Sequence, residues 1–242
     1  MIVFFVNYNT PRLIECAIRS LWKHTPKADV VVFDNSDREP FTAPSGSPAG
    51  KAPVPCGFPQ GQIEVIDNTR SQFIDFDKEL ARYPDKEYSQ RNRSNFGSAK
   101  HAMSVDWLMD HYQDCHDFVL ADSDVLFRRD ITPIVNLKKA VAGSIQRKEG
   151  IPLLMPQLCW LNVPLLREHH IRYFNGEKMW ALSNRYPNNR YDTGAWLYEE
   201  IGHYRLPFKE ININDYILHM GHASWKDKDP EHWLNDNKQL WI

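Results

Sequence analysis

The N-terminal part of the chain carries a strand–helix–strand pattern that constrains the fold more than any other feature. Residues 2–6 and 30–33 are runs of β-branched and aromatic residues, as expected for strands buried on both faces of a sheet. Between them, apolar residues recur at helical spacing over 13–22, after Thr10 and Pro11, which favour a helix start. Strands joined in this way pair in parallel through a right-handed crossover. The sequence therefore predicts an α/β fold.

A third apolar run, 118–121, ends in two carboxylates, Asp122 and Asp124. Two like charges this close repel each other, and a divalent cation between them removes the repulsion. Mg²⁺ and Mn²⁺ prefer carboxylate oxygens and keep further positions for water and substrate phosphates. Two other Asp-x-Asp sequences, 75–77 and 227–229, follow no apolar strand and read as solvated turns. The strand context therefore makes Asp122-Ser123-Asp124 the candidate site for a metal and a diphosphate.

Polar residues at the ends of the other predicted strands lie where ligands bind in such sheets. Tyr8 follows the first strand, and its ring is suited to stack on a nucleobase. Asp34 closes the second strand, where it either accepts a hydrogen bond from a base or ribose or caps the next turn. Near the C-terminus, His219 and His222 flank Gly221, and a neutral imidazole is a suitable third ligand for Mn²⁺.

The remaining patterns predict further elements. Residues 38–62 hold six of the chain's 16 Pro and four of its 11 Gly, which predicts an irregular insertion loop, either solvated or acting as a lid. Residues 63–66 predict a strand. Residues 95–107 predict a helix whose glycine-containing start favours phosphate. A further helix is predicted after Pro133, from apolar residues at helical spacing over 134–145.

Composition narrows the class of protein. A formal charge of −2 and a pI near 6.5 argue against a nucleic-acid partner. The cysteines show no Cys-x-x-Cys pairing, which fits free thiols in a reducing compartment. The sequence shows no signal-peptide core and no stretch long enough to cross a membrane. We therefore predict a cytoplasmic protein, with peripheral contact to the inner face of the membrane left open.

Several of these stretches resemble the family-2 glycosyltransferases of the GT-A fold. Residues 6–9, the helix over 13–25 and residues 32–36 look like the opening of that family. Residues 95–97, with Ala99, are similar to its second nucleotide-side motif. The resemblance implies one GT-A domain over 1–242, with a mostly parallel central sheet flanked by helices and a Rossmann-like N-terminal half. It also implies a nucleotide-sugar-binding half, 1–130, and an acceptor-binding half, 131–242.

The metal motif connects the chain to a second family of the same fold. Residues 120–127 look like the family-2 metal motif and also like that of family 8, and residues 219–221 are similar to the C-terminal metal-binding His-x-Gly of family 8. The metal ligands that the resemblance implies are Asp122, Asp124 and His219, with His222 as the alternative. The donor-binding residues that it implies are Val6, Tyr8, Asp34, Asn35, Asn95, Gly97, Asp122 and Ser123.

The resemblance implies a metal-dependent glycosyltransferase that uses Mn²⁺ or Mg²⁺. The donor would be a nucleotide sugar, UDP-linked by default, and the acceptor a glycan or lipid-linked glycan. Enzymes of family 2 invert the configuration at the anomeric carbon of the sugar, and enzymes of family 8 retain it. The longer N-terminal match favours inversion, which needs a carboxylate base. Asp192 occupies the expected place of that base, with Glu199 and Glu200 as rivals.

Three alternatives stay open at this point. A haloacid-dehalogenase-type phosphohydrolase also places Asp-x-Asp after a strand. In that group the motif lies near the N-terminus and continues as Asp-x-Asp-x-Thr, whereas this chain has Leu126 in place of the Thr. A nucleotidyltransferase on a similar fold is the second alternative. The third is a non-catalytic sugar-binding module, because six of the eight Trp lie in the C-terminal part, over 160–241.

Overall fold

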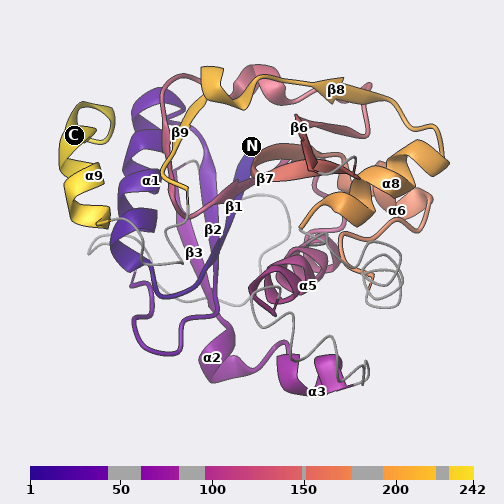
Figure 1. Ribbon diagram of the computed structural model, residues 1–242, viewed down its shortest axis with the longest axis horizontal. Helices are drawn as coiled ribbons and strands as arrows, with labels where there is room; N and C mark the ends of the chain where they lie inside the picture. The colour runs from indigo at the N-terminus through magenta and orange to yellow at the C-terminus, as the bar shows by residue number, and fades with distance from the viewer. Residues whose placement is uncertain (43–60, 82–95, 149–150, 176–192, 222–228) are drawn as a thin grey trace.

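The computed structural model describes residues 1–42, 61–81, 96–148, 151–175, 193–221 and 229–242. In this part of the chain, seven strands form a sheet in the order β3-β2-β1-β4-β7-β6-β8 (Figure 1). These strands are β1 (Ile2–Asn7), β2 (Asp29–Asp34), β3 (Ile63–Asp67), β4 (Phe118–Asp122), β6 (Val141–Lys148), β7 (Ile151–Leu161) and β8 (Phe208–Glu210). A second sheet pairs β5 (Val125–Phe127) with β9 (Ile217–His219).

The helices connect the strands and cover the sheet. They are α1 (Pro11–His24), α2 (Asn68–Ser71), α3 (Phe76–Ala81), α5 (Phe96–His111), α6 (Val163–Glu168), α8 (Ala195–His203) and α9 (Pro230–Asp236). Short 3-10 turns occur at Thr132–Ile134, Ile213–Asp215 and Lys238–Leu240.

The large sheet is mostly parallel, as predicted. The pairs β1–β2, β1–β4, β2–β3 and β6–β8 are parallel, whereas β7 runs antiparallel to both β4 and β6. In the parallel register Asn7 lies opposite Asp34, and Val6 lies opposite Asp122. The polar ends of β1, β2 and β4 therefore meet at one edge of the sheet.

The two faces of the sheet carry separate apolar clusters, because successive strand residues point to opposite sides. Phe5 and Val32 pack with Ile14 and Leu21 of α1 on one face. Phe4 and Leu120 pack with residues of α5 on the other, where Phe4 stacks on Phe118 at a centroid distance of 3.9 Å. Figure 1 shows α1 and α9 on one side of the sheet and α5, α6 and α8 on the other.

The prediction of a helix over 134–145 is wrong. The chain instead forms a short 3-10 turn that ends at Ile134, and then enters β6 at Val141. Leu137, expected on the apolar face of that helix, is 61% exposed. Val141 pairs with Leu161 on one side and with Phe208 on the other, so contacts with distant segments override the local periodicity.

Other predicted elements are confirmed within one to four residues of their expected ends. These are β1, α1, β2, β3, β4 and α5. The predicted insertion over 38–62 lies largely outside the described residues, and its flanks, 38–42 and 61–62, belong to no helix or strand. Among the described residues, no helix has the length and apolar character needed to cross a bilayer.

Candidate metal and donor site

Three of the predicted metal ligands converge at the polar edge of the sheet. The ligand atoms of Asp122, Asp124 and His219 all lie within 4.8 Å of one another. His219 Nε2 lies 3.1 Å from Asp124 Oδ1. The carboxylate of Asp124 is largely buried, with 13% of its side chain exposed, whereas the His219 ring is 29% exposed. The cluster is therefore anchored in the protein on one side and accessible to solvent on the other.

The small β5–β9 sheet brings His219 to the two aspartates across 95 residues of sequence. Val125 lies opposite His219 in this antiparallel pair, and the Met220 amide donates to the Asp124 carbonyl oxygen at 3.0 Å. Leu126 and Met220 pack into an apolar cluster with Leu13 of α1. Main-chain pairing and packing together hold the imidazole beside Asp124.

Ser123, between the two aspartates, is linked by hydrogen bonds to the end of β1. Its hydroxyl lies 3.0 Å from Thr10 Oγ1, and Thr10 donates to Asn7 Oδ1 at 2.7 Å. The sequence predicted Thr10 as a helix cap, but its side chain makes no capping hydrogen bond in α1. Thr10 is therefore a site residue that the sequence analysis missed; the polar run from Asn7 to Thr10 after a buried strand was the available signal.

Asp34 lies at the same edge and turns its carboxylate inward. Its Oδ1 accepts hydrogen bonds from Asn7 Nδ2 at 3.0 Å and from the Ser36 amide and hydroxyl at 3.1 and 2.5 Å. Its Oδ2 accepts from the Phe41 amide at 2.7 Å. Only 2% of Asp34 is exposed. These contacts match the alternative in which Asp34 caps the turn after β2, and a direct contact with the donor stays a prediction.

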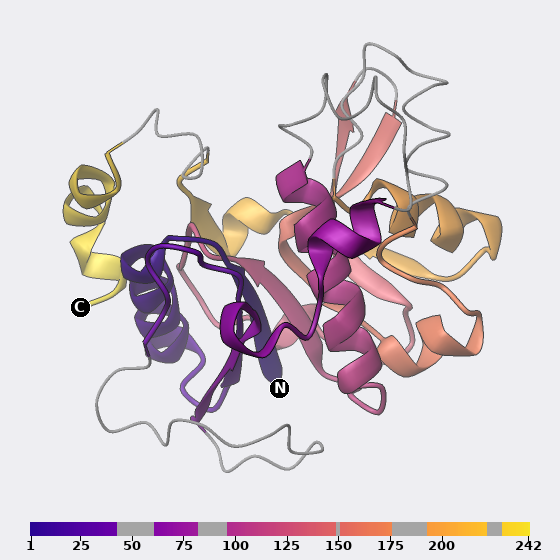
Figure 2. The same ribbon diagram turned by 90° about the horizontal axis from the view of Figure 1, so that it is seen from below.

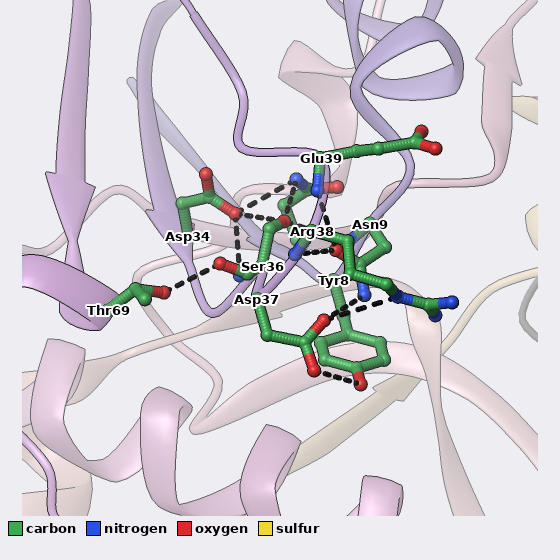
Figure 3. A network of polar contacts seen from close by, with 9 residues as sticks. Tyr8, Asn9, Asp34, Ser36, Asp37, Arg38, Glu39 and Thr69 are labelled. Carbon is green, nitrogen blue, oxygen red and sulfur yellow. Dashed lines mark hydrogen bonds and ion pairs between the residues drawn. The ribbon is translucent and has the colours of Figure 1, made fainter.

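Tyr8 stands on the surface beside this turn (Figure 3). Its side chain is 47% exposed, and its hydroxyl donates to Asp37 Oδ2 at 3.3 Å. Asn9, in a left-handed conformation with φ 54°, donates to Asp37 Oδ1 at 2.6 Å. This hydrogen bond from Asn9 lowers the pKa of Asp37. Tyr8 is therefore linked to the turn by its hydroxyl and is partly open to solvent, and its stacking on a base stays a prediction.

The remaining predicted site residues differ in where they lie. Val6 is a core residue whose main chain pairs with β2 and β4. Asn35 donates to Ser104 Oγ of α5 at 2.9 Å and accepts from Asn68 Nδ2 at 3.1 Å, so it links the end of β2 to two helices. Gly97 lies in the first turn of α5. Asn95, Asp192 and His222 lie outside the described residues.

The start of α8 lies against β7. Gly194 caps this helix with φ 86°, and a Cβ atom there would lie 2.1 Å from the Leu154 carbonyl oxygen. Thr193, which directly follows the predicted base in the sequence, is buried. Of the rival bases on α8, Glu199 is exposed and Glu200 is half-buried.

The residues at this edge fit a hard divalent cation. The three ligand atoms lie within 4.8 Å of one another, close enough for one ion to contact all of them, and His219 Nε2 lies 3.1 Å from Asp124 Oδ1. The two carboxylates suit Mn²⁺ or Mg²⁺, and a set of three protein ligands leaves positions for water and phosphate oxygens.

Comparison with known proteins identifies the fold. No protein-family model matches this chain, and a search of curated proteins found no match. The structure of the galactosyltransferase LgtC, in complex with donor and acceptor sugar analogues, matches with a TM-score of 0.52 and 15% identity, over 88% of this chain and 74% of that one. Mouse xyloside xylosyltransferase 1 in its apo form matches with a TM-score of 0.51 and 11% identity, over 99% and 92% of the two chains. The chain has the GT-A fold that the sequence predicted.

Proposed function

We propose that this protein is a metal-dependent glycosyltransferase of one GT-A domain. It transfers a sugar from a nucleoside diphosphate, UDP by default, to a hydroxyl group of a glycan or lipid-linked glycan. The observation that carries the proposal is the cluster of Asp122, Asp124 and His219 at the edge where the strands of the mostly parallel sheet end. In sheets of this kind ligands bind at that edge. We also propose a cytoplasmic location, which is supported by three described cysteines that are buried free thiols, Cys16, Cys115 and Cys159.

Each group at the edge has a role in this mechanism. Asp122, Asp124 and His219 hold the cation, which when bound supplies positive charge against the leaving nucleoside diphosphate. The Tyr8 ring stacks on the base, and Asp37 and Asn9 keep that ring in place. Thr10 orients Ser123 next to the diphosphate. In this proposal the bond between sugar and phosphate would lie near the end of β4, where the cation would be held.

Inversion at the sugar needs a base for the acceptor hydroxyl, and we assign this role to Asp192. Support comes from Gly194, which lies two residues after it in the sequence and packs against Leu154 of β7, the strand next to β4 in the sheet. We expect Asp192→Asn to bind the donor normally and to lose at least about a hundredfold in kcat. A near-wild-type kcat would move the role to Glu199 or Glu200, for which Glu199→Gln and Glu200→Gln are the next variants, or favour retention.

The proposal is tested by turnover of a panel of UDP-sugars with Mn²⁺ and with EDTA, measured as UDP release in the presence and absence of oligosaccharide acceptors. We expect Mn²⁺-dependent release from at least one donor, and its loss in Asp122→Asn. Binding without any release would support a sugar-binding module. Hydrolysis of an aryl phosphate in place of a nucleotide sugar would support a phosphohydrolase.

A further inference from the structure

A buried glutamine with an unpaired oxygen lies beside the metal cluster. Gln157 of β7 is only 9% exposed, and its Oε1 atom has no hydrogen-bond partner among the residues that the structure describes. Burying an amide oxygen without a partner destabilises a folded protein, and such groups are few in native structures. This position therefore requires an explanation beyond packing.

The strand register places Gln157 next to Asp122. In the antiparallel β4–β7 pair, Leu120 lies opposite Cys159 and Ala121 lies opposite Leu158, so the next pair is Asp122 and Gln157. Leu120 and Cys159 point to the face covered by α5, and by alternation Asp122 and Gln157 point to the same face. Burial raises the pKa of the Cys159 thiol and the Asp122 charge raises it further, which agrees with Asp122 facing this side.

An irregularity in the β6–β7 register sets Gln157 apart from the ladder on its other side. Gly143 of β6 lies opposite Cys159, and Ile145 lies opposite Leu154, so Ser144 alone faces the four residues 155–158 of β7. This interruption is wider than a one-residue β-bulge, and it leaves Gln157 without a ladder partner on β6. In Figure 2 part of the β6–β7 pair projects away from the rest of the sheet. By the β4–β7 register, Gln157 lies at the end of β4 that carries the metal motif.

The chemistry of the carboxamide indicates what it binds. It is neutral, with an acceptor oxygen and a donor nitrogen, and a hydroxyl group satisfies both. A diphosphate offers acceptors only and would leave Oε1 unpaired. We infer that Gln157 Oε1 accepts a hydrogen bond from a hydroxyl group of the donor's sugar, and that Gln157 thereby selects which sugar is bound. This inference rests on the proposed function and assigns to the same site a residue that recognises the sugar.

The first test needs no ligand. Gln157→Met keeps a side chain of similar length and removes the unpaired oxygen. We expect its melting temperature without ligand to rise by at least about 2–4 °C, the shift for a modest gain in stability in a chain of this size. Gln146→Met is the matched control, because Gln146 is an exposed glutamine on the neighbouring strand β6. An unchanged or lower melting temperature for Gln157→Met would show that Oε1 is already satisfied and would overturn the inference.

The second test uses calorimetry with Mn²⁺ alone, with UDP, and with UDP-glucose, UDP-galactose and UDP-xylose in the presence of Mn²⁺. In Gln157→Met we expect about tenfold weaker binding of the preferred UDP-sugar, which corresponds to the loss of one hydrogen bond. The affinities for UDP and for Mn²⁺ should stay within about twofold of wild type. Gln146→Met should change none of these. Equal loss for UDP and UDP-sugar, loss of Mn²⁺ binding, or unchanged UDP-sugar affinity would each overturn the inference. Wild-type protein that binds none of these nucleotides would instead overturn the proposed function.

Discussion

Gly194 provides a quantitative test of how α8 is positioned against β7. It adopts φ 86°, and a Cβ atom there would lie 2.1 Å from the Leu154 carbonyl oxygen and 3.3 Å from the Leu154 Cβ atom. The left-handed conformation costs an alanine about 1–2 kcal/mol. Relieving the overlap with backbone costs about 1–3 kcal/mol more, by analogy with overpacked cores. Gly194→Ala should therefore lower the free energy of unfolding by about 2–5 kcal/mol.

Thermal unfolding followed by circular dichroism measures this effect. For a chain of this size, a loss of that magnitude lowers the melting temperature by about 4–20 °C. Gly202→Ala is the matched control, because it lies in the same helix and a Cβ atom there would meet nothing within 4 Å. Alanine has the higher helix propensity, so the control should be neutral or stabilised by up to about 1 kcal/mol. A melting temperature of Gly194→Ala equal to that of wild type would refute the packing of α8 on β7 described above.

Two further predictions concern titration and metal binding. Burial raises the pKa of Asp106 to about 7, above its ordinary value of 3.8, despite hydrogen bonds from Arg172 and the Tyr173 amide. The stability that this group contributes is therefore full below pH 4 and is lost as pH rises to about 7. Asp106→Asn should flatten the pH dependence of the denaturant midpoint between pH 4 and 7, and an unchanged slope would contradict the raised pKa of Asp106. His219→Ala should weaken Mn²⁺ binding measured by calorimetry while His222→Ala leaves it near wild type, and the reverse order would move the third ligand to His222.

The fold was predictable where burial is encoded locally. Residues 2–6 and 118–121 are apolar throughout because both faces of these strands are covered, and α1 shows its buried face in the spacing of Leu13, Ile14 and Leu21. The region over 134–145 carries an equally clear helical spacing, and there the prediction was wrong. The partners of Val141 lie in β7 and β8, and no local pattern reveals a strand whose pairing depends on segments far along the chain.

For the candidate site, the individual residues were predictable but their arrangement in space was not. Asp122 and Asp124 followed from a strand that ends in carboxylates, and His219 from its place beside Gly221. Their convergence depends on the three-residue ladder of β5 and β9, too short to predict from sequence. The contact between Thr10 and Ser123 and the unpaired oxygen of Gln157 depend on tertiary register.

The most direct test of the central claim is the affinity for UDP, measured by calorimetry with Mn²⁺ and with EDTA. The variant is Asp124→Asn, and the control is Asp75→Asn, in an Asp-x-Asp sequence at the start of α3. If Asp124 holds a cation on the diphosphate, wild type and Asp75→Asn will bind UDP at least about tenfold more tightly with Mn²⁺, a difference of about 1.4 kcal/mol. Asp124→Asn will lose that difference. Equal UDP affinity of the wild type with Mn²⁺ and with EDTA would contradict the account.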